Sequence, residues 1–308
     1  MVVEEHHAGQ RIDVVLAALF PQYSRTQLTT WLKDGVITVN QRPYKPKEKV
    51  MGGECIQLHS LPVLNNTHCE PQDVPLNIVF EDEDLLIINK PAGLVVHPGA
   101  GHQDATLVNG LLYHDPELQA LPRAGIIHRL DKDTTGLLIV AKHLTSYTQL
   151  IRAMQARLIQ RCYVALVHGQ VIAGQTIQTF YGRHPHQRLK MAVCAQGKEA
   201  ITQYRVNERL GEFTLLDVQL MTGRTHQIRV HMAHARHPVV GDPLYNPVRV
   251  YSTRLPEPVR QALHQFKRQA LHACTLSFTH PMKHTELQFS APRPDDFQEL
   301  LDIMGANV

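Results

Sequence analysis

The sequence has few cysteines, and they follow no recognised ligand or redox spacing. Five are scattered over 308 residues without a C-x-x-C pair, which is typical of reduced thiols and gives no zinc-ligand pattern. Long apolar runs are also absent, since none approaches the roughly 18 residues that span a membrane. The first stretch, MVVEEHHAGQ, is too acidic and polar for a signal peptide. These absences predict a cytoplasmic protein that does not enter a membrane.

Phosphate loops and metal motifs are missing as well. The chain has no G-x-x-x-x-G-K-[ST] motif, and GAGHQD at 99–104 lacks the third glycine of a dinucleotide fingerprint, which argues against nucleotide-dependent chemistry. Four histidines crowd residues 226–237, but no H-E-x-x-H pattern and no acidic or thiol ligand lies among them. We therefore predict neither a metal nor a cofactor.

What the sequence does have is positive charge in clusters. The formal net charge is only +3, yet residues 123–161 carry seven Lys/Arg against two acids. Residues 222–237 carry three Arg and four His with no acid. Clusters of this kind indicate a phosphate-rich ligand, although a solvated basic face has the same composition. A motif has to decide between these two interpretations.

Residues 9–60 are predicted to form a small unit of their own. Apolar residues at 12, 15, 16 and 19 predict an amphipathic helix that ends at Pro21, and Ser24 can cap a second helix that stops at Gly35. Two short strands follow, VITVN and ECIQLH. This order resembles the S4-type RNA-binding domain, although a packing subdomain without RNA contacts is the alternative. The resemblance makes the basic side chains of the unit candidate RNA contacts: Arg11, Arg25, Lys33, Arg42, Lys45 and Lys47.

The rest of the chain is predicted to be a linker and one large domain. Residues 61–75 hold three prolines and little periodicity, which is typical of a linker. Residues 76–308 predict an α+β domain around a mixed, largely antiparallel central sheet, because strands and helices do not alternate regularly. The expected strands flank the acidic turn at 81–84 and include GLLIVAK, RCYVALVHG and EFTLLDVQL.

The segment GIIHRLDKDTTGLLIVAK, residues 125–142, places four charges between apolar runs that are expected to be buried strands. Asp131 and Asp133 are candidates for a glycosidase pair, but that mechanism needs two carboxylates about 5–9 Å apart on either side of one bond. Neighbouring positions on one loop rarely provide this arrangement. A carboxylate that works here is expected to work alone, and a buried structural acid is the alternative for Asp131.

Four motifs together resemble the RluA-type family of RNA pseudouridine synthases. They are NKPAGLVVHPG, HRLDKDTTG, RCYVALVHG and TGRTHQIRVHMAHARHPVVGDPLY, in this order behind the S4-like unit. With that unit the resemblance covers roughly residues 9–300. Within the family, VHPGAG and PRAGIIHRLDKDTTGLLIVAK are most similar to the D type, whose members modify large-subunit ribosomal RNA.

The resemblance implies roles for individual residues. Asp131 is the expected catalytic carboxylate, acting as nucleophile at C1′ or as base at C2′ of the uridine. Arg229 in HQIR is its expected partner, because an adjacent cation favours the ionised form of a buried carboxyl. Tyr163 is expected to stack on the target base. Arg129 is expected to fill the gap that this base leaves or to contact a phosphate, and Lys90 to be structural or to touch the RNA.

The D-type resemblance further implies an isomerase that forms pseudouridine in 23S ribosomal RNA without a cofactor, in the helix 69 stem-loop. Its expected partner is the large-subunit ribosomal RNA or the assembling 50S subunit, and nothing in the sequence suggests more than a monomer. Two alternatives stay open. One is a C-type synthase for other 23S sites, and the other is a ribosome-assembly factor that binds RNA without catalysis.

Overall fold

The computed structural model describes residues 1–20, 23, 25–58, 69–99, 104–187, 189–246 and 251–307. The predicted helix stop at Pro21 and the predicted cap at Ser24 lie outside the described residues. Positions 61–68 of the predicted linker and 100–103 of GAGHQD lie outside them too. Of the helices in the described ranges, none has both the length and the apolar character that crossing a bilayer requires.

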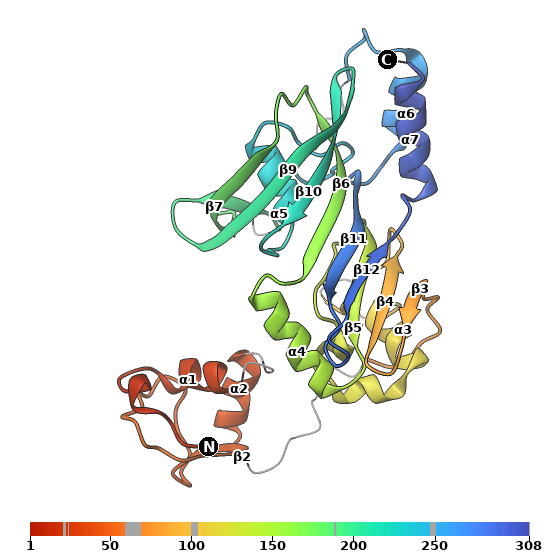
Figure 1. Ribbon diagram of the computed structural model, residues 1–308. Helices are drawn as coiled ribbons and strands as arrows, with labels where there is room; N and C mark the ends of the chain where they lie inside the picture. Colours follow the sequence, from red (N-terminus) through yellow and green to blue (C-terminus); the bar gives the residue numbers. More distant parts are fainter. Residues whose placement is uncertain are drawn as a thin grey trace.

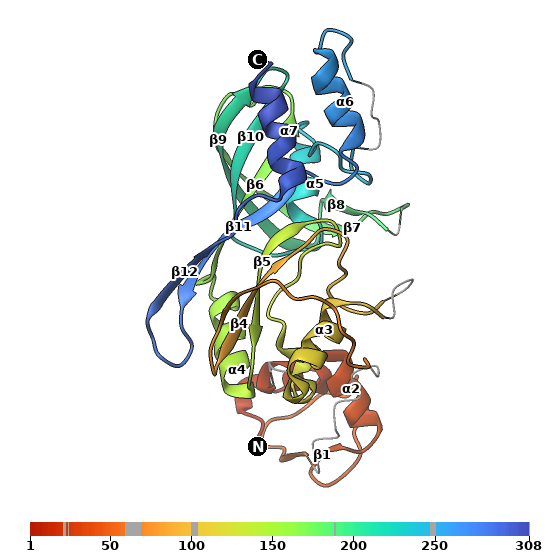
Figure 2. The same cartoon turned by 90° about the vertical axis from the view of Figure 1, so that its right-hand side faces the viewer.

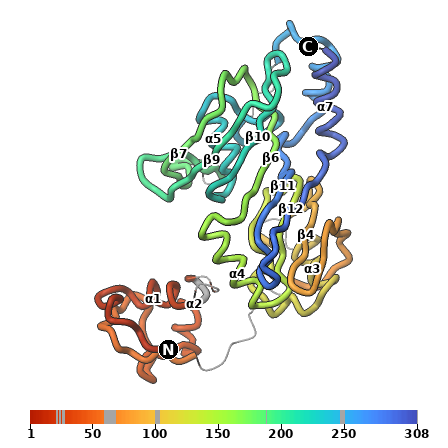
Figure 3. Tube along the Cα trace, viewed as in Figure 1, coloured from red at the N-terminus to blue at the C-terminus, as the bar shows by residue number. Residues whose placement is uncertain are grey.

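The N-terminal unit consists of two helices and a two-stranded sheet, drawn as the red and orange part of the trace in Figure 3. After a 3-10 turn at Glu5–His7, α1 spans Ile12–Leu19 and α2 spans Arg25–Lys33. The strands β1 (Ile37–Val39) and β2 (Ile56–Leu58) pair antiparallel. Apolar side chains of both helices are buried against the strands, as their helical spacing predicted. The helix pair and hairpin of the S4-like prediction are confirmed.

The larger part of the chain is built on one ten-stranded sheet (Figure 1). The strand order is β3-β4-β5-β11-β6-β10-β9-β7-β8, and β12 pairs with β11. All pairs of this sheet are antiparallel except β5 with β11, which confirms the mixed, largely antiparallel sheet. The strands are β3 Ile78–Glu81, β4 Leu85–Lys90, β5 Thr135–Ala141, β6 Gln160–His168, β7 Gln175–Arg183, β8 Met191–Cys194, β9 Lys198–Leu210, β10 Phe213–Leu220, β11 Leu271–Thr279 and β12 Glu286–Ser290.

Helices cover both faces of the sheet around β5. Leu137 and Ile139 pack on the side of α4, while Leu138 and Val140 pack on the opposite side in the core that includes α3. Because side chains alternate along a strand, burial on both faces requires the continuous apolar run of GLLIVA. Near the C-terminus α6 contacts α7, and Figure 2 shows where the two helices lie. The helices are α3 Leu107–His114, α4 Leu144–Gln155, α5 Gln227–His234, α6 Glu257–Gln265 and α7 Asp295–Gly305, with 3-10 turns at Pro116–Ala120 and Pro122–Gly125.

One strand expectation was wrong. The apolar pair Ile126-Ile127 does not form a strand, because only Ile126 makes an isolated bridge, to Val140. Asp131 therefore does not end a strand but lies in the loop that leads into β5. The loop conformation depends on contacts from other parts of the chain, which local apolar content does not reveal.

The close approach of β5 to β11 predicts a strong glycine requirement at position 136. Gly136 has a φ of +113°, and a Cβ there would lie 2.2 Å from the carbonyl oxygen of Ala273, its partner on β11. We expect Gly136→Ala to lower the free energy of unfolding by at least about 2 kcal/mol, because backbone strain adds to overpacking. Urea unfolding measures this loss.

Gly211→Ala is the matched control. Gly211 in the β9–β10 turn also has a positive φ, +60°, but a Cβ added there would have no atom within 4 Å. Only the left-handed conformation is then penalised, at about 1 kcal/mol. Equal losses in the free energy of unfolding for the two variants would show that the close contact between β5 and β11 adds nothing to the cost of a side chain at position 136.

Candidate active site

Asp131 is held by an arginine from a distant helix. The Nη1 atom of Arg229 on α5 donates a hydrogen bond to Asp131 Oδ2 at 2.9 Å. The Asp131 side chain is 17% exposed and that of Arg229 is 6% exposed, so the pair lies at the edge of the interior. The expected ion pair between these two residues is therefore present in the structure.

A second carboxylate, which the sequence patterns did not reveal, fixes the other side of Arg229. Asp242 is fully buried, and its oxygens accept hydrogen bonds from Arg229 Nε at 2.7 Å and Nη2 at 2.9 Å. Asp242 Oδ1 also accepts from the backbone N–H groups of Leu244 and Tyr245. The only signal was an acid in GDPLY, at the end of a longer family motif. In the sequence it looks like an ordinary turn residue.

The charges of Arg229 and of its acidic partners stabilise one another. Burial by itself would lower the pKa of Arg229, but hydrogen bonds and charge from Asp242, together with Asp131, raise it above its ordinary value. Burial would raise the pKa of Asp242, yet Arg229 and two backbone N–H groups hold it below its usual range. The two partners are thus both charged at neutral pH, as a buried pair requires.

A cavity of about 470 Å³ opens beside Asp131. Tyr163 on β6 lines it and is only 4% exposed. Burial raises the pKa of this tyrosine to about 12, so its hydroxyl stays protonated. The cavity is within the size range of small-ligand pockets, and an aromatic ring next to a carboxylate can hold a flat ring over it.

The cavity wall is strongly basic. Among the described residues, Asp131 is the single acid in the lining. Five arginines line the cavity: Arg123, Arg129, Arg157, Arg161 and Arg224. Arg129 is exposed and lines this wall together with Asp131. A pocket of this charge favours a phosphate-bearing ligand over a merely solvated basic face.

Lys90 does not face this cavity, and the expectation of an RNA contact was wrong. Its side chain is fully buried, and Nζ donates to the carbonyl oxygens of Pro91, Leu94 and Lys132 at 2.7–2.9 Å. Burial lowers the pKa of Lys90 to about 7, against the opposing charges of Asp133 and Asp131. Three carbonyl acceptors match the three N–H groups of an ammonium. Lys90 therefore acts structurally, by fixing the residue that follows Asp131.

A second carboxylate across the cavity, which a glycosidase would need, is not among its described lining residues. Asp133 lies at a different pocket, and its backbone carbonyl accepts a hydrogen bond from Arg268 Nη1 at 3.3 Å. Arg268 also forms two 2.7 Å hydrogen bonds to Asp296 on α7. The loop that carries Asp131 is thus fixed at two successive carbonyl groups, by Lys90 and by Arg268.

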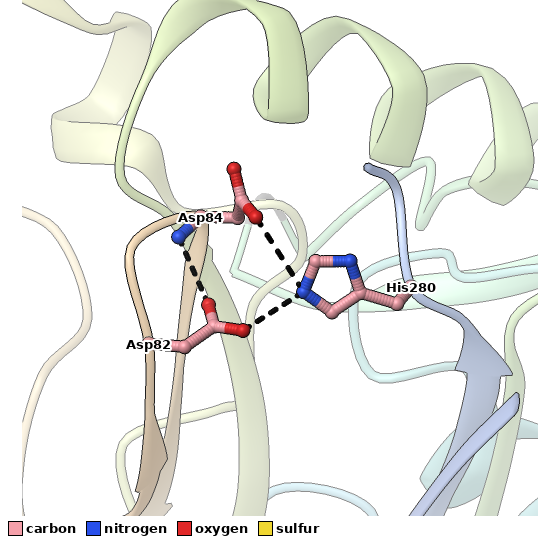
Figure 4. A group of neighbouring side chains, drawn as sticks. All are labelled: Asp82, Asp84 and His280. Carbon is pink, nitrogen blue, oxygen red and sulfur yellow. Dashed lines mark hydrogen bonds and ion pairs between the residues drawn. The ribbon is translucent and has the colours of Figure 1, made fainter. Parts of the chain in front are cut away.

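One cluster elsewhere has the composition of a metal site, namely Asp82, Asp84 and His280 (Figure 4). The Nδ1 atom of His280 accepts hydrogen bonds from the backbone N–H groups of Met282 and Lys283. The proton of the neutral ring is therefore on Nε2, which donates to Asp82 at 2.9 Å. Neither nitrogen has a free lone pair for a metal. The cluster joins the β3–β4 turn to the turn after β11.

The candidate RNA contacts of the N-terminal unit fall into two groups. The Lys33, Arg42, Lys45 and Lys47 side chains are exposed. Arg11 and Arg25 are also exposed, but both hold the carboxylate of Asp13, at 2.8 and 2.7 Å. Part of their charge is therefore already matched within the unit.

Comparison with known proteins identifies the family of the chain. Residues 84–234 match the family model described as RNA pseudouridylate synthase, and residues 10–55 match the S4 domain. The chain is 48% identical over 303 residues to the ribosomal large subunit pseudouridine synthase D of Xanthomonas campestris, covering 98% of this chain and 91% of that one. The chain belongs to the RNA pseudouridylate synthases.

The synthase is also similar to the protein of the same description from Escherichia coli K12, at 47% identity over 306 residues, covering 99% of this chain and 94% of that one. Among solved structures, human RNA pseudouridylate synthase domain containing 1 matches with a TM-score of 0.55 and 25% identity, over 76% of this chain and 96% of that one. The predicted family and its D-type resemblance are therefore confirmed. The molecule is an enzyme, a pseudouridine synthase with an S4 domain.

The geometry predicts that Asp242 is essential for placing Arg229. Asp242→Asn keeps the size of the side chain but leaves the arginine without its buried counter-charge. We expect the free energy of unfolding near neutral pH to fall by about 3–5 kcal/mol, and pseudouridine formation to fall with it. Chemical unfolding and a tritium-release assay measure the two effects.

The pH dependence of this loss tests its cause. The folded-state pKa of Asp242 lies below the ordinary pKa of an aspartate. Its contribution to the free energy of unfolding is therefore fully present above the ordinary pKa and is lost as the pH falls through the folded-state pKa. The difference between wild type and variant should therefore shrink in acid. Asp217→Asn, an exposed acid on β10, is the control and should change stability by less than about 0.5 kcal/mol. A pH-independent difference would contradict the electrostatic explanation.

Proposed function

We propose that this synthase converts uridine to pseudouridine in 23S ribosomal RNA, in the helix 69 stem-loop, as free RNA or in the assembling 50S subunit. The observation that carries the proposal is that Asp131, paired with Arg229, lies at the wall of an arginine-lined cavity. The relatives described as ribosomal large subunit pseudouridine synthase D support the choice of RNA. Such a substrate implies work in the cytoplasm, and the enzyme is expected to act as a monomer without a cofactor.

The proposed chemistry uses one carboxylate. The N-glycosidic bond of the uridine breaks, the base rotates, and a carbon–carbon bond to the sugar forms, with no net oxidation or reduction. Asp131 acts as nucleophile at C1′ or as base at C2′, and either role needs the ionised form. Arg229 orients the carboxylate through its 2.9 Å hydrogen bond, since Asp242 holds the guanidinium in place.

The other site residues are proposed to handle the base and the strand. A uridine has to leave its stack before Asp131 can reach the sugar, at a cost of a few kcal/mol. Tyr163 would stack on the extruded base inside the cavity, and Arg129 would fill the gap in the RNA or hold a phosphate. Both residues line the cavity together with Asp131, which supports these roles.

The N-terminal unit is proposed to add phosphate contacts. We divide the chain into an S4-like domain at 9–60, a linker at 61–75 and a catalytic domain at 76–308. Exposed positive charge comes from Lys33, Arg42, Lys45 and Lys47, and Arg11 and Arg25 add to it. Such contacts bind without strong sequence preference and depend steeply on salt.

Pseudouridine mapping on unmodified large-subunit ribosomal RNA tests the proposed reaction. Wild-type enzyme should produce new pseudouridine in the helix 69 loop. Asp131→Asn should fold, bind the RNA and form none, because the amide is neither a nucleophile nor a base of comparable strength. The matched control is Asp133→Asn, whose side chain does not line the cavity; it should retain most of the activity.

The other outcomes of the mapping are also informative. Modification at other 23S positions would favour the C-type alternative. Modification only on transfer RNA would keep the chemistry and overturn the proposed substrate. Appreciable turnover by Asp131→Asn would remove this residue from the mechanism.

Salt dependence tests the N-terminal contacts in the full chain. Substituting glutamine for Lys33, Arg42, Lys45 and Lys47 should weaken RNA binding and reduce the slope of log affinity against log salt by about 0.7 per lost phosphate contact. The rate at saturating RNA should be unchanged. The control replaces four exposed cations of the larger domain outside the cavity: Lys198, Arg205, Arg209 and Arg254. An equal change in both variants would show only a general effect of net charge.

A further inference from the structure

Arg161 is a buried cation without a counter-charge. It lies on β6 two residues before Tyr163, so both side chains are on the same face of the strand and line the same cavity. It is 7% exposed, and within the described ranges no carboxylate oxygen lies within 4.0 Å of its guanidinium nitrogens. Burial lowers its pKa, an effect that is opposed by the interaction with Tyr163 but by no carboxylate. The buried arginines Arg229 and Arg268, by contrast, each have a carboxylate partner.

The hydrogen bonds of Arg161 are also incomplete. One Nη2 contact reaches the carbonyl oxygen of Leu220 at 3.4 Å, which is long for such a bond. The Nε atom is buried and has no partner among the described residues. A buried, unpaired charge destabilises a fold, so its presence at a cavity wall indicates a ligand that completes it.

His128 provides a second unsatisfied donor at the same cavity. Its Nε2 atom accepts a hydrogen bond from the backbone N–H of Ile139 at 3.3 Å, so the proton of the neutral ring is on Nδ1. This Nδ1 atom is buried and has no partner in the described part of the chain. Burial lowers the pKa of His128 to about 3, and the charge of Arg161 acts in the same direction. The ring is therefore a neutral donor close to the guanidinium.

A glycine leaves room around the Arg161 guanidinium. A Cβ added at Gly223, in the loop after β10, would lie 2.6 Å from Arg161 Nη1. The loop backbone thus approaches the guanidinium closely, and a side chain there would displace it. Thr222, Gly223 and Arg224 of this loop also line the cavity.

We propose that Arg161 and His128 form a phosphate-binding subsite, which holds an RNA phosphate next to the uridine that reaches Asp131. The proposal rests on the proposed function, because the ligand is part of the same RNA. A phosphate supplies the missing negative charge and acceptor oxygens, and the planar guanidinium matches it with two parallel hydrogen bonds. Arg161 is about 7 Å along β6 from Tyr163, close enough for a phosphate flanking the stacked nucleotide. Arg161 would then fix the strand while Tyr163 holds the base.

Arg161→Met tests the subsite, because it removes the charge and keeps most of the volume. RNA binding is measured in the Asp131→Asn background, so that turnover does not interfere. We expect affinity to fall about tenfold or more, and the salt slope to become shallower by about 0.7, the value for one single-strand phosphate. The melting temperature should be unchanged or higher, since an unpaired buried charge is lost. Arg161→Lys should keep the salt slope while recovering only part of the affinity.

Two control variants separate this effect from others. Arg209→Met removes an exposed arginine of β9 outside the cavity and should alter neither affinity nor slope. Arg268→Met removes a buried arginine that is paired, and should lower the melting temperature. If Arg161→Met is destabilised like Arg268→Met, or binds RNA like wild type with the same slope, the proposal is wrong.

Neutral methylphosphonate linkages identify the bound group. A hairpin is made from the loop in which wild-type mapping finds pseudouridine, with one substitution on the 5′ or 3′ side of the target uridine. One of these two substituted hairpins should bind the protein that retains Arg161 as weakly as the unsubstituted hairpin binds the Arg161→Met variant. The same substitution should not weaken binding to the Arg161→Met variant any further. Equal effects on both proteins would overturn the phosphate contact and leave a uracil carbonyl as the acceptor. Because this arm requires active wild type, a protein that forms no pseudouridine would instead refute the proposed function.

Discussion

The arrangement of the active site depends on one arginine between two acids. Buried charges are stable only when their partners and hydrogen bonds are complete. Asp242 takes two donors of the Arg229 fork and leaves Nη1 for Asp131. Asp242 is in turn held by the backbone N–H groups of Leu244 and Tyr245. The carboxylate at the cavity is thus oriented by a series of contacts that leads through Arg229 and Asp242 to the backbone of Leu244 and Tyr245.

The loop itself is held through its backbone. Lys90 binds the carbonyl oxygen of Lys132, and Arg268 binds that of Asp133. This leaves the side chains of Arg129 and Asp131 free to face the cavity. The segment has little regular structure, so its precision comes from buried cations supplied by β4 and by the segment before β11. A functional loop is often positioned by the scaffold around it in this way.

Much of this architecture could be predicted from local patterns, while the contacts between distant segments could not. Helix α1 follows from the helical spacing of Ile12, Val15 and Leu16, and strand β5 follows from its continuous apolar run. The motifs also identified Asp131 and Arg229 as partners. The burial of Lys90 gave no such signal, because a lysine next to a proline has the same sequence whether three carbonyl groups surround it or water does. Asp242 was missed for a similar reason, and the parallel pairing of β5 with β11 joins segments separated by most of the domain.

The position of β11 in the chain has a consequence for when the enzyme becomes active. This strand begins at Leu271, yet it lies between β5 and β6 in the sheet, and Arg268 just before it is held by α7 near the end of the chain. On the ribosome, the N-terminal unit has all its own segments early and can fold first. The two halves of the central sheet can be joined only after the last strands emerge. A nascent chain therefore passes through a stage in which the N-terminal unit is folded but the loop around Asp131 is not yet held in place, because β11 and α7 have still to emerge.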